Sequence, residues 1–169
     1  YSDEKERLRL TDSKGDLLPV VHEIIELVKH HDMILASGHV SLAETLKLFQ
    51  AASDTGVERM IITHPDINAD LGLLIQIVGL GAYPEYTMLS CTPSRGRTTP
   101  SELVAKIREI GVDRCVVATD FGQWMNPSPA EGMRMAISEL LFAGMEPDEV
   151  SSLVKVNPLE LLQVTQRFP

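Results

Sequence analysis

Residues 33–39 read MILASGH, and this stretch indicates the fold of the whole chain. The apolar run Met33–Ala36 predicts a buried strand, and the Ser-Gly pair after it predicts a sharp turn that leads to His39. The same order recurs twice, because MIITH ends in His64 and CVVATD ends in Asp120. In parallel α/β folds, ligands bind at the carboxyl ends of the strands, so these three polar residues are candidate site residues.

Helical segments separate these strands. Ser41 with Glu44 three residues later forms the pattern of a capping box at the start of one of them. The predicted elements are a helix from Asp16, a strand over Met33–Ala36, a helix from Ser41 to about Asp54, a strand over Arg59–Ile62, a helix over 68–79, a strand over Ala82–Leu89, a helix from Thr99 or Ser101 to Ile110, a strand over Val112–Ala118, and helices over 129–143, over 147–154 and after Asn157. Strands that follow one another at about 25–30 residues are typical of βα units in a parallel sheet. Four such strands fit half of an eight-stranded barrel or a small open sheet.

Composition narrows the class of protein. The chain has 169 residues, of which 44% are hydrophobic and 23% are charged, which is typical of a globular domain. The formal net charge of −9 and the scattered basic residues argue against a nucleic-acid surface. No apolar run is long enough to span a membrane, and no signal peptide precedes the first helix. We expect residues 1–15 to form a tail or loop and residues 16–169 to form the domain.

The two cysteines, Cys91 and Cys115, lie in or beside apolar runs. We expect both to be reduced and buried, as in a cytoplasmic protein, because their spacing fits neither a zinc knuckle nor a redox pair.

Two imidazoles and a carboxylate are ligand types that zinc and related divalent metals prefer. His39 and His64 stand at equivalent places on strands that neighbour each other in a parallel sheet, so both rings can reach one metal ion. Alternatives remain for each residue taken alone. A lone histidine at a strand end often satisfies a backbone carbonyl, and Asp120 has the residue type of a helix N-cap.

Three further residues are candidates for substrate binding. Glu85 lies within the third predicted strand, where it contacts a metal ion or substrate if it faces inward and is solvated if it lies outward at an edge. Arg95 and Arg97 lie in the loop after that strand and can bind an anionic substrate. Gln123, Trp124 and Asn126 are candidate lid residues beside Asp120.

The series GHVSLAE, MIITHP, ATDFGQ and VNPLELL resembles the second half of a TIM barrel of the amidohydrolase superfamily, close to a set of uncharacterised metal-dependent hydrolases. The resemblance covers the chain from about residue 16 and implies an α/β fold in which this chain supplies about the last four βα units of a (β/α)8 barrel. It implies that His39, His64 and Asp120 hold a divalent metal, zinc before manganese, iron or nickel. It also implies that Asp120 takes a proton from the attacking water in the hydrolysis of a small substrate.

The chain departs from the superfamily pattern in two places. No His-x-His pair occurs, and the bridging Lys or Glu of the fourth barrel strand is missing. The site is therefore either completed by another segment or degenerate. A non-catalytic binding or scaffold protein that has lost its metal is the first alternative to a hydrolase, and a metal-free open-sheet enzyme is the second.

The last expectation concerns partners. Four βα units leave two outer strands open, so we expect them to pair with an N-terminal half-barrel segment or with a second copy of the chain in a homo-oligomer. Tyr1 is not a usual first residue, which favours the N-terminal segment.

Overall fold

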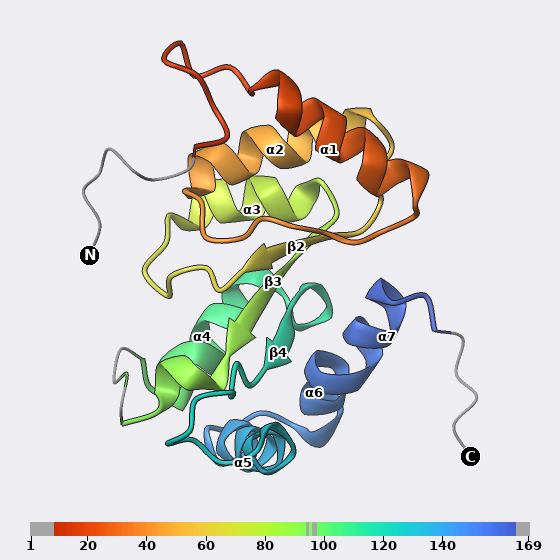
Figure 1. Cartoon of the computed structure of the whole chain (residues 1–169). Helices are drawn as coiled ribbons and strands as arrows, with labels where there is room; N and C mark the ends of the chain where they lie inside the picture. Colours follow the sequence, from red (N-terminus) through yellow and green to blue (C-terminus); the bar gives the residue numbers. More distant parts are fainter. Residues whose placement is uncertain (1–8, 94, 96–97, 165–169) are drawn as a thin grey trace. The chain divides into compact units, whose positions relative to one another are not determined.

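A computed structural model of the chain describes residues 9–93, 95 and 98–164 (Figure 1). The fold is α/β, with one sheet of four strands in the order β1-β2-β3-β4. β1 pairs in parallel with β2, and β3 pairs in parallel with β4. The strands are β1 Leu35–Ala36, β2 Met60–Thr63, β3 Ala82–Thr87 and β4 Val116–Ala118. The helices are α1 Pro19–His30, α2 Leu42–Asp54, α3 Leu71–Gly79, α4 Pro100–Ile110, α5 Pro129–Phe142, α6 Pro147–Ser151 and α7 Asn157–Leu161.

The order of the predicted elements is confirmed, but three of the four strands are shorter than the sequence predicts. Met33 belongs to the turn that ends α1, because its N–H donates to Val28, and β1 therefore begins only at Leu35. The third predicted strand ends in a 3-10 turn over Met88–Cys91, and the fourth is preceded by one over Val112–Arg114. Apolar runs of this kind cannot by their pattern alone be divided between strand and tight turn.

The helix starts follow the capping signals. The predicted capping box of Ser41 and Glu44 is present at the start of α2. Thr99 and Glu102 form a second one, which places the start of α4 at Pro100. Asp70 caps α3 through the Leu73 N–H, so this helix begins at Leu71.

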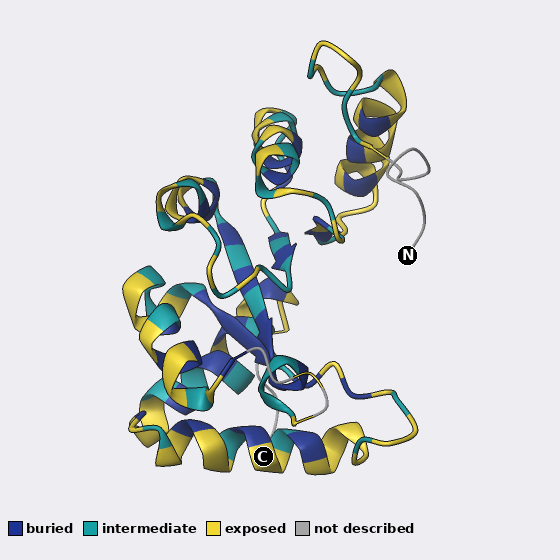
Figure 2. Ribbon diagram, turned by 90° about the vertical axis from the view of Figure 1, so that its left-hand side faces the viewer, coloured by how far each residue is buried: buried dark blue, intermediate teal, exposed yellow. Residues whose placement is uncertain are grey.

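The described chain divides into two compact units. The first holds the described residues up to Ile62 together with Asp70–Ala82, and the second holds Thr63–Ala69 and the residues from Tyr83 onward. In the first unit α2 packs against α1 and α3. Figure 2 shows the buried residues concentrated on the strands and on one side of the helices.

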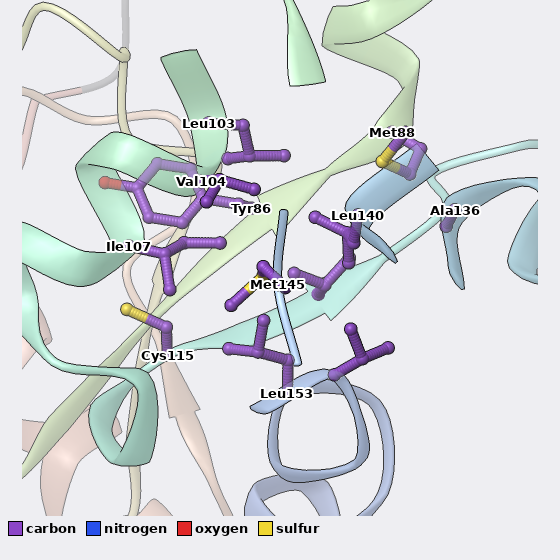
Figure 3. Close-up of a cluster of buried hydrophobic side chains, with 12 residues drawn as sticks. Tyr86, Met88, Leu103, Val104, Ile107, Cys115, Ala136, Leu140, Met145 and Leu153 are labelled. Atoms are coloured by element: carbon purple, nitrogen blue, oxygen red, sulfur yellow. The ribbon is translucent and has the colours of Figure 1, made fainter. Parts of the chain in front are cut away.

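The second unit has its own hydrophobic core, drawn in Figure 3. Side chains of β3, β4, α4, α5 and the C-terminal helices form it: Tyr86, Met88, Leu103, Val104, Ile107, Cys115, Val117, Ala136, Leu140, Met145, Val150 and Leu153. Asn157 at the start of α7 is buried, and its side chain donates to the carbonyls of Val112 and Cys115 at 2.9 and 2.6 Å. These bonds hold α7 to the segment that leads into β4.

Cys115 is buried as predicted, whereas Cys91 is only half-buried, and both are free thiols. Cys91 is the last residue of the 3-10 turn that follows β3. Within the described residues, no helix is long and apolar enough to cross a membrane.

Candidate functional site

His64 and Asp120 lie together in the second unit. His64 directly follows β2 and Asp120 follows β4 after one residue, so both stand at carboxyl ends of parallel strands. His64 Nε2 lies 3.8 Å from Asp120 Oδ2. Their side chains are 29% and 41% exposed, so both remain accessible to a ligand.

Both residues have a left-handed backbone conformation. φ is 43° at His64 and 54° at Asp120. Among the described residues, Asp32 and Gln163 are the other non-glycine residues with positive φ. Such conformations are rare for residues with a side chain and cluster at functional sites, where surrounding contacts hold them.

Hydrogen bonds hold the turn around Asp120. The carbonyl of Thr119 accepts from the Leu89 N–H at 3.1 Å, and Thr119 Oγ1 accepts from the Phe121 N–H at 3.3 Å. The carbonyl of Asp120 accepts from Gln123 Nε2 at 3.1 Å. Asp120 does not cap a helix, since α5 begins at Pro129 and its N-cap is Ser128.

Glu85 faces the candidate site. Tyr86 points into the hydrophobic core of the second unit, so Glu85 lies on the opposite face of β3, level with Val116 of β4. Burial raises the pKa of the Glu85 carboxyl, His64 lowers it, and the charge of Asp120 raises it further. Glu85 is thus partly buried and feels the charges of His64 and Asp120, and its contact with a metal ion or substrate stays a prediction.

His39 belongs to the first unit and is exposed after β1. Gly38 before it has φ 63°, a left-handed conformation that fits the sharp turn predicted there. A Cβ at Gly38 would have no neighbour within 4 Å, so the backbone conformation and not a close approach favours glycine there. The convergence of His39 with His64 stays a prediction.

The donor set fits a divalent metal in part. Imidazole nitrogen and carboxylate oxygen are zinc ligands, and two ligands of one tetrahedral zinc lie about 3.3 Å apart. The observed 3.8 Å between His64 Nε2 and Asp120 Oδ2 is close to that separation. Across residues 9–93, 95 and 98–164, however, no group of three or more His, Cys, Asp or Glu side chains is arranged to hold a metal ion. The described pair therefore supplies two ligands, and a third must come from elsewhere.

The remaining candidates lie in loops. Arg95 is exposed, and Arg97 lies outside the described residues. Gln123 stabilises the loop after Asp120 through two hydrogen bonds. Its Nε2 donates to the Asp120 carbonyl, and its Oε1 accepts from Asn126 Nδ2. Trp124 in this loop is 93% exposed.

Sequence reasoning missed the contact between Phe121, the residue after Asp120, and Gly132 of α5. The signal that could have found them is the glycine itself, since Gly132 interrupts the helical pattern of 129–143.

Comparisons with known proteins support the fold. A family described as "Family of unknown function (DUF6282)" matches residues 1–85, just over half of the chain. No curated protein matches the sequence. The solved structure of the phosphotriesterase homology protein from Escherichia coli, complexed with phosphate in its active site, is similar with a TM-score of 0.68 and 16% sequence identity. The match covers 90% of this chain and 57% of that one. The predicted fold class is thereby confirmed as an α/β fold that forms part of a TIM barrel, and the chain spans little more than half of the protein it resembles.

Proposed function

We propose that the chain, which belongs to the family of unknown function DUF6282, is part of a metal-dependent hydrolase. Its substrate is a small molecule in which water attacks a C–N, C–O or P–O bond. The observation that carries this proposal is the pair of His64 and Asp120, 3.8 Å apart at two strand ends and both held at positive φ. A TIM-barrel neighbour with an active site that holds phosphate supports it.

His64 and Asp120 would hold the divalent metal, zinc before manganese, iron or nickel, and His39 is the candidate that the sequence offers for a further ligand. A bound ion of this kind supplies Lewis acidity and lowers the pKa of a bound water to about 7. The Asp120 carboxylate accepts the proton of the attacking water. Glu85 on the inner face of β3 and Arg95 in the following loop contact the substrate, and we assign Arg97 to the same role.

The partner in this proposal is a second half-barrel, either an N-terminal segment or a second copy of the chain. β1 and β4 are the outer strands of the described sheet. Two helices carry exposed apolar side chains, which are Val20, Ile24 and Leu27 on α1 and Met135 and Phe142 on α5. A half-barrel that closes the sheet would cover both the strand edges and these side chains.

We assign the protein to the cytoplasm, because Cys91 and Cys115 are both free thiols.

Zinc titration of the metal-free chain by calorimetry tests the proposal. The variants are His64→Ala and Asp120→Asn, and the matched controls are His22→Ala on α1 and Asp148→Asn on α6, both at exposed positions. We expect the first two to lose zinc binding and the controls to keep it. Hydrolysis of p-nitrophenyl acetate and p-nitrophenyl phosphate should fall at least about 100-fold in Asp120→Asn, as expected for loss of a general base.

The same experiment distinguishes the hydrolase from the alternative function. A chain that binds no zinc would favour the alternative, a non-catalytic binding or scaffold protein that has lost its metal, which the lack of a third arranged ligand among the described residues also favours. Zinc binding that is equal in all variants would contradict the site.

A further inference from the structure

We propose that Gly132 on α5 is a positioning residue for Asp120 and that it acts through the ring of Phe121. The inference rests on the proposed function, because Asp120 is the carboxylate that this function uses. It adds a residue that contacts neither metal nor substrate.

Gly132 leaves no room for a side chain. A Cβ built on it would lie 2.7 Å from Cε2 of Phe121 and closer still to Cδ2. Contacts below 3.0 Å do not occur for real Cβ atoms, so any side chain at position 132 must displace the ring. Phe121 is 7% exposed, and the ring is therefore confined on its other sides as well.

Glycine is also an unfavourable residue at this place in a helix. Gly132 lies inside α5, on the buried stripe that continues with Ala136 and Leu140. Alanine would stabilise an isolated helix there, because it restricts the unfolded chain more than glycine does. Close packing of Phe121 against the helix backbone is the feature that accounts for glycine.

The packing of Phe121 reaches Asp120 through the backbone. Asp120 is exposed, but the residues on both sides of it, Thr119 and Phe121, are buried. The Phe121 N–H donates to Thr119 Oγ1, which closes a short turn around Asp120 at φ 54°. A ring displaced from α5 would shift this turn, because rigid peptide units join the three residues. The carboxylate would then move away from His64 Nε2.

A role in packing alone is the alternative to this proposal, and the two differ in what they change. Loss of packing lowers the stability of the fold and leaves the distance between Asp120 and His64 as it is. Loss of positioning changes that distance and the binding of a metal ion between the two residues, even where the fold remains stable.

The test uses the whole 169-residue chain with zinc as the probe and Gly132→Ala as the main variant. The control is Gly79→Ala, a glycine of α3 whose added Cβ would have no neighbour within 4 Å. We expect Gly132→Ala to weaken zinc binding about 10-fold or more, as loss of an outer-shell contact does. Without metal, the NMR amide resonances of His64 and Asp120 should shift in Gly132→Ala and stay in place in Gly79→Ala.

Phe121→Val completes the experiment, since valine lacks the δ and ε atoms that meet position 132. This single variant should also weaken zinc binding, because it frees the turn without altering α5. Adding Gly132→Ala to it should then change zinc affinity by no more than about 3-fold, because the two changes act on one contact. If Gly132→Ala does not fold, Phe121→Val alone still tests whether the contact between the two residues positions Asp120.

Unchanged zinc affinity and unchanged His64 and Asp120 resonances in either single variant would overturn the proposal and leave a packing role only. A wild-type chain that binds no zinc would contradict the proposed function. The NMR resonances of His64 and Asp120 in the metal-free protein would still decide whether Gly132 positions Asp120.

Discussion

His64 and Asp120 are held at φ values of 43° and 54°, a conformation that costs most residues with a side chain about 1 kcal/mol or more. Aspartate tolerates it better than most, but glycine adopts it without steric cost. Glycine would therefore be the more stable residue at these two strand ends, yet the sequence has histidine and aspartate there.

A first prediction follows for Asp120→Gly. The unfolding free energy, measured with urea, should stay unchanged or rise by up to about 1 kcal/mol, because the strain is relieved. Asp148→Gly in the first turn of α6 is the control and should lower it by about 1 kcal/mol. A loss of stability in Asp120→Gly as large as in the control would show that the conformation at Asp120 is not strained.

A second prediction concerns Tyr86 in the core of the second unit. Its hydroxyl is buried and has no hydrogen-bond partner within the described residues. Tyr86→Phe should therefore leave the unfolding free energy unchanged or raise it by about 1 kcal/mol, because an unsatisfied polar group is removed. Tyr83→Phe is the matched control, because the Tyr83 hydroxyl donates to Glu160 and its loss should be slightly destabilising. Destabilisation by Tyr86→Phe greater than in the control would reveal a partner for its hydroxyl.

Which residues form the candidate site was predictable in part. The apolar runs before His64 and Asp120 place both at strand ends, and parallel strands bring such ends to one edge. The sequence left the direction of Glu85 open, because a strand of alternating burial shows which residues share a face but not which face is inward. The contact of Phe121 with Gly132 joins the loop after β4 to α5 and has no local sequence pattern.

At the scale of the elements, Arg108 joins α4 to the start of α6. Its Nη2 donates to the carbonyl of Gly144 at 2.8 Å and to Glu149 Oε2 at 2.9 Å. Arg108 holds the pKa of the Glu149 carboxyl below its ordinary value, and the Glu146 N–H lowers it as well. The carboxylate of Glu149 thus closes both a capping box and an ion pair.

A pH dependence follows from this pKa. Because the folded-state pKa lies below the ordinary value of 4.5, the contribution of Glu149 is present above pH 4.5 and is lost as the pH falls through the lowered value. Glu149→Gln should lower the Tm at pH 7 and flatten its fall between pH 5 and 3. Glu23→Gln, at an exposed position on α1, is the control, and its Tm should change with pH as that of the wild type does. If the Tm of Glu149→Gln fell as steeply as that of the wild type between pH 5 and 3, this account would be contradicted.

Helix starts were more predictable than strand ends, for a physical reason. A capping box is a local contact between residues three apart, as in Ser41 with Glu44, so its sequence pattern is sufficient. The end of a strand depends on the neighbouring strand. Met88 and Leu89 are as apolar as strand residues, yet they form a 3-10 turn.

At the scale of the whole molecule, the described sheet supplies four strands of a barrel, and α1 and α5 carry exposed apolar side chains. We predict that the 169-residue chain alone self-associates through these faces. Light scattering after size-exclusion chromatography should show a concentration-dependent mass. Ile24→Lys and Phe142→Lys should each weaken association about 10-fold or more, since each removes an apolar side chain from the interface.

Leu162→Lys is the control for this prediction, because Leu162 is also exposed but follows α7 and belongs to neither α1 nor α5. A wild-type chain that stays monomeric at every concentration would contradict barrel closure by a second copy. It would leave closure by a preceding half-barrel to be tested with a longer chain.

The central claim is that His64 and Asp120 bind one metal ion, and anomalous diffraction from crystals grown with zinc tests it most directly. The account predicts a peak within bonding distance, about 2.1 Å, of both His64 Nε2 and Asp120 Oδ2. A crystal in which zinc occupies other positions while these two atoms, 3.8 Å apart in the structure described above, hold no ion between them would contradict it.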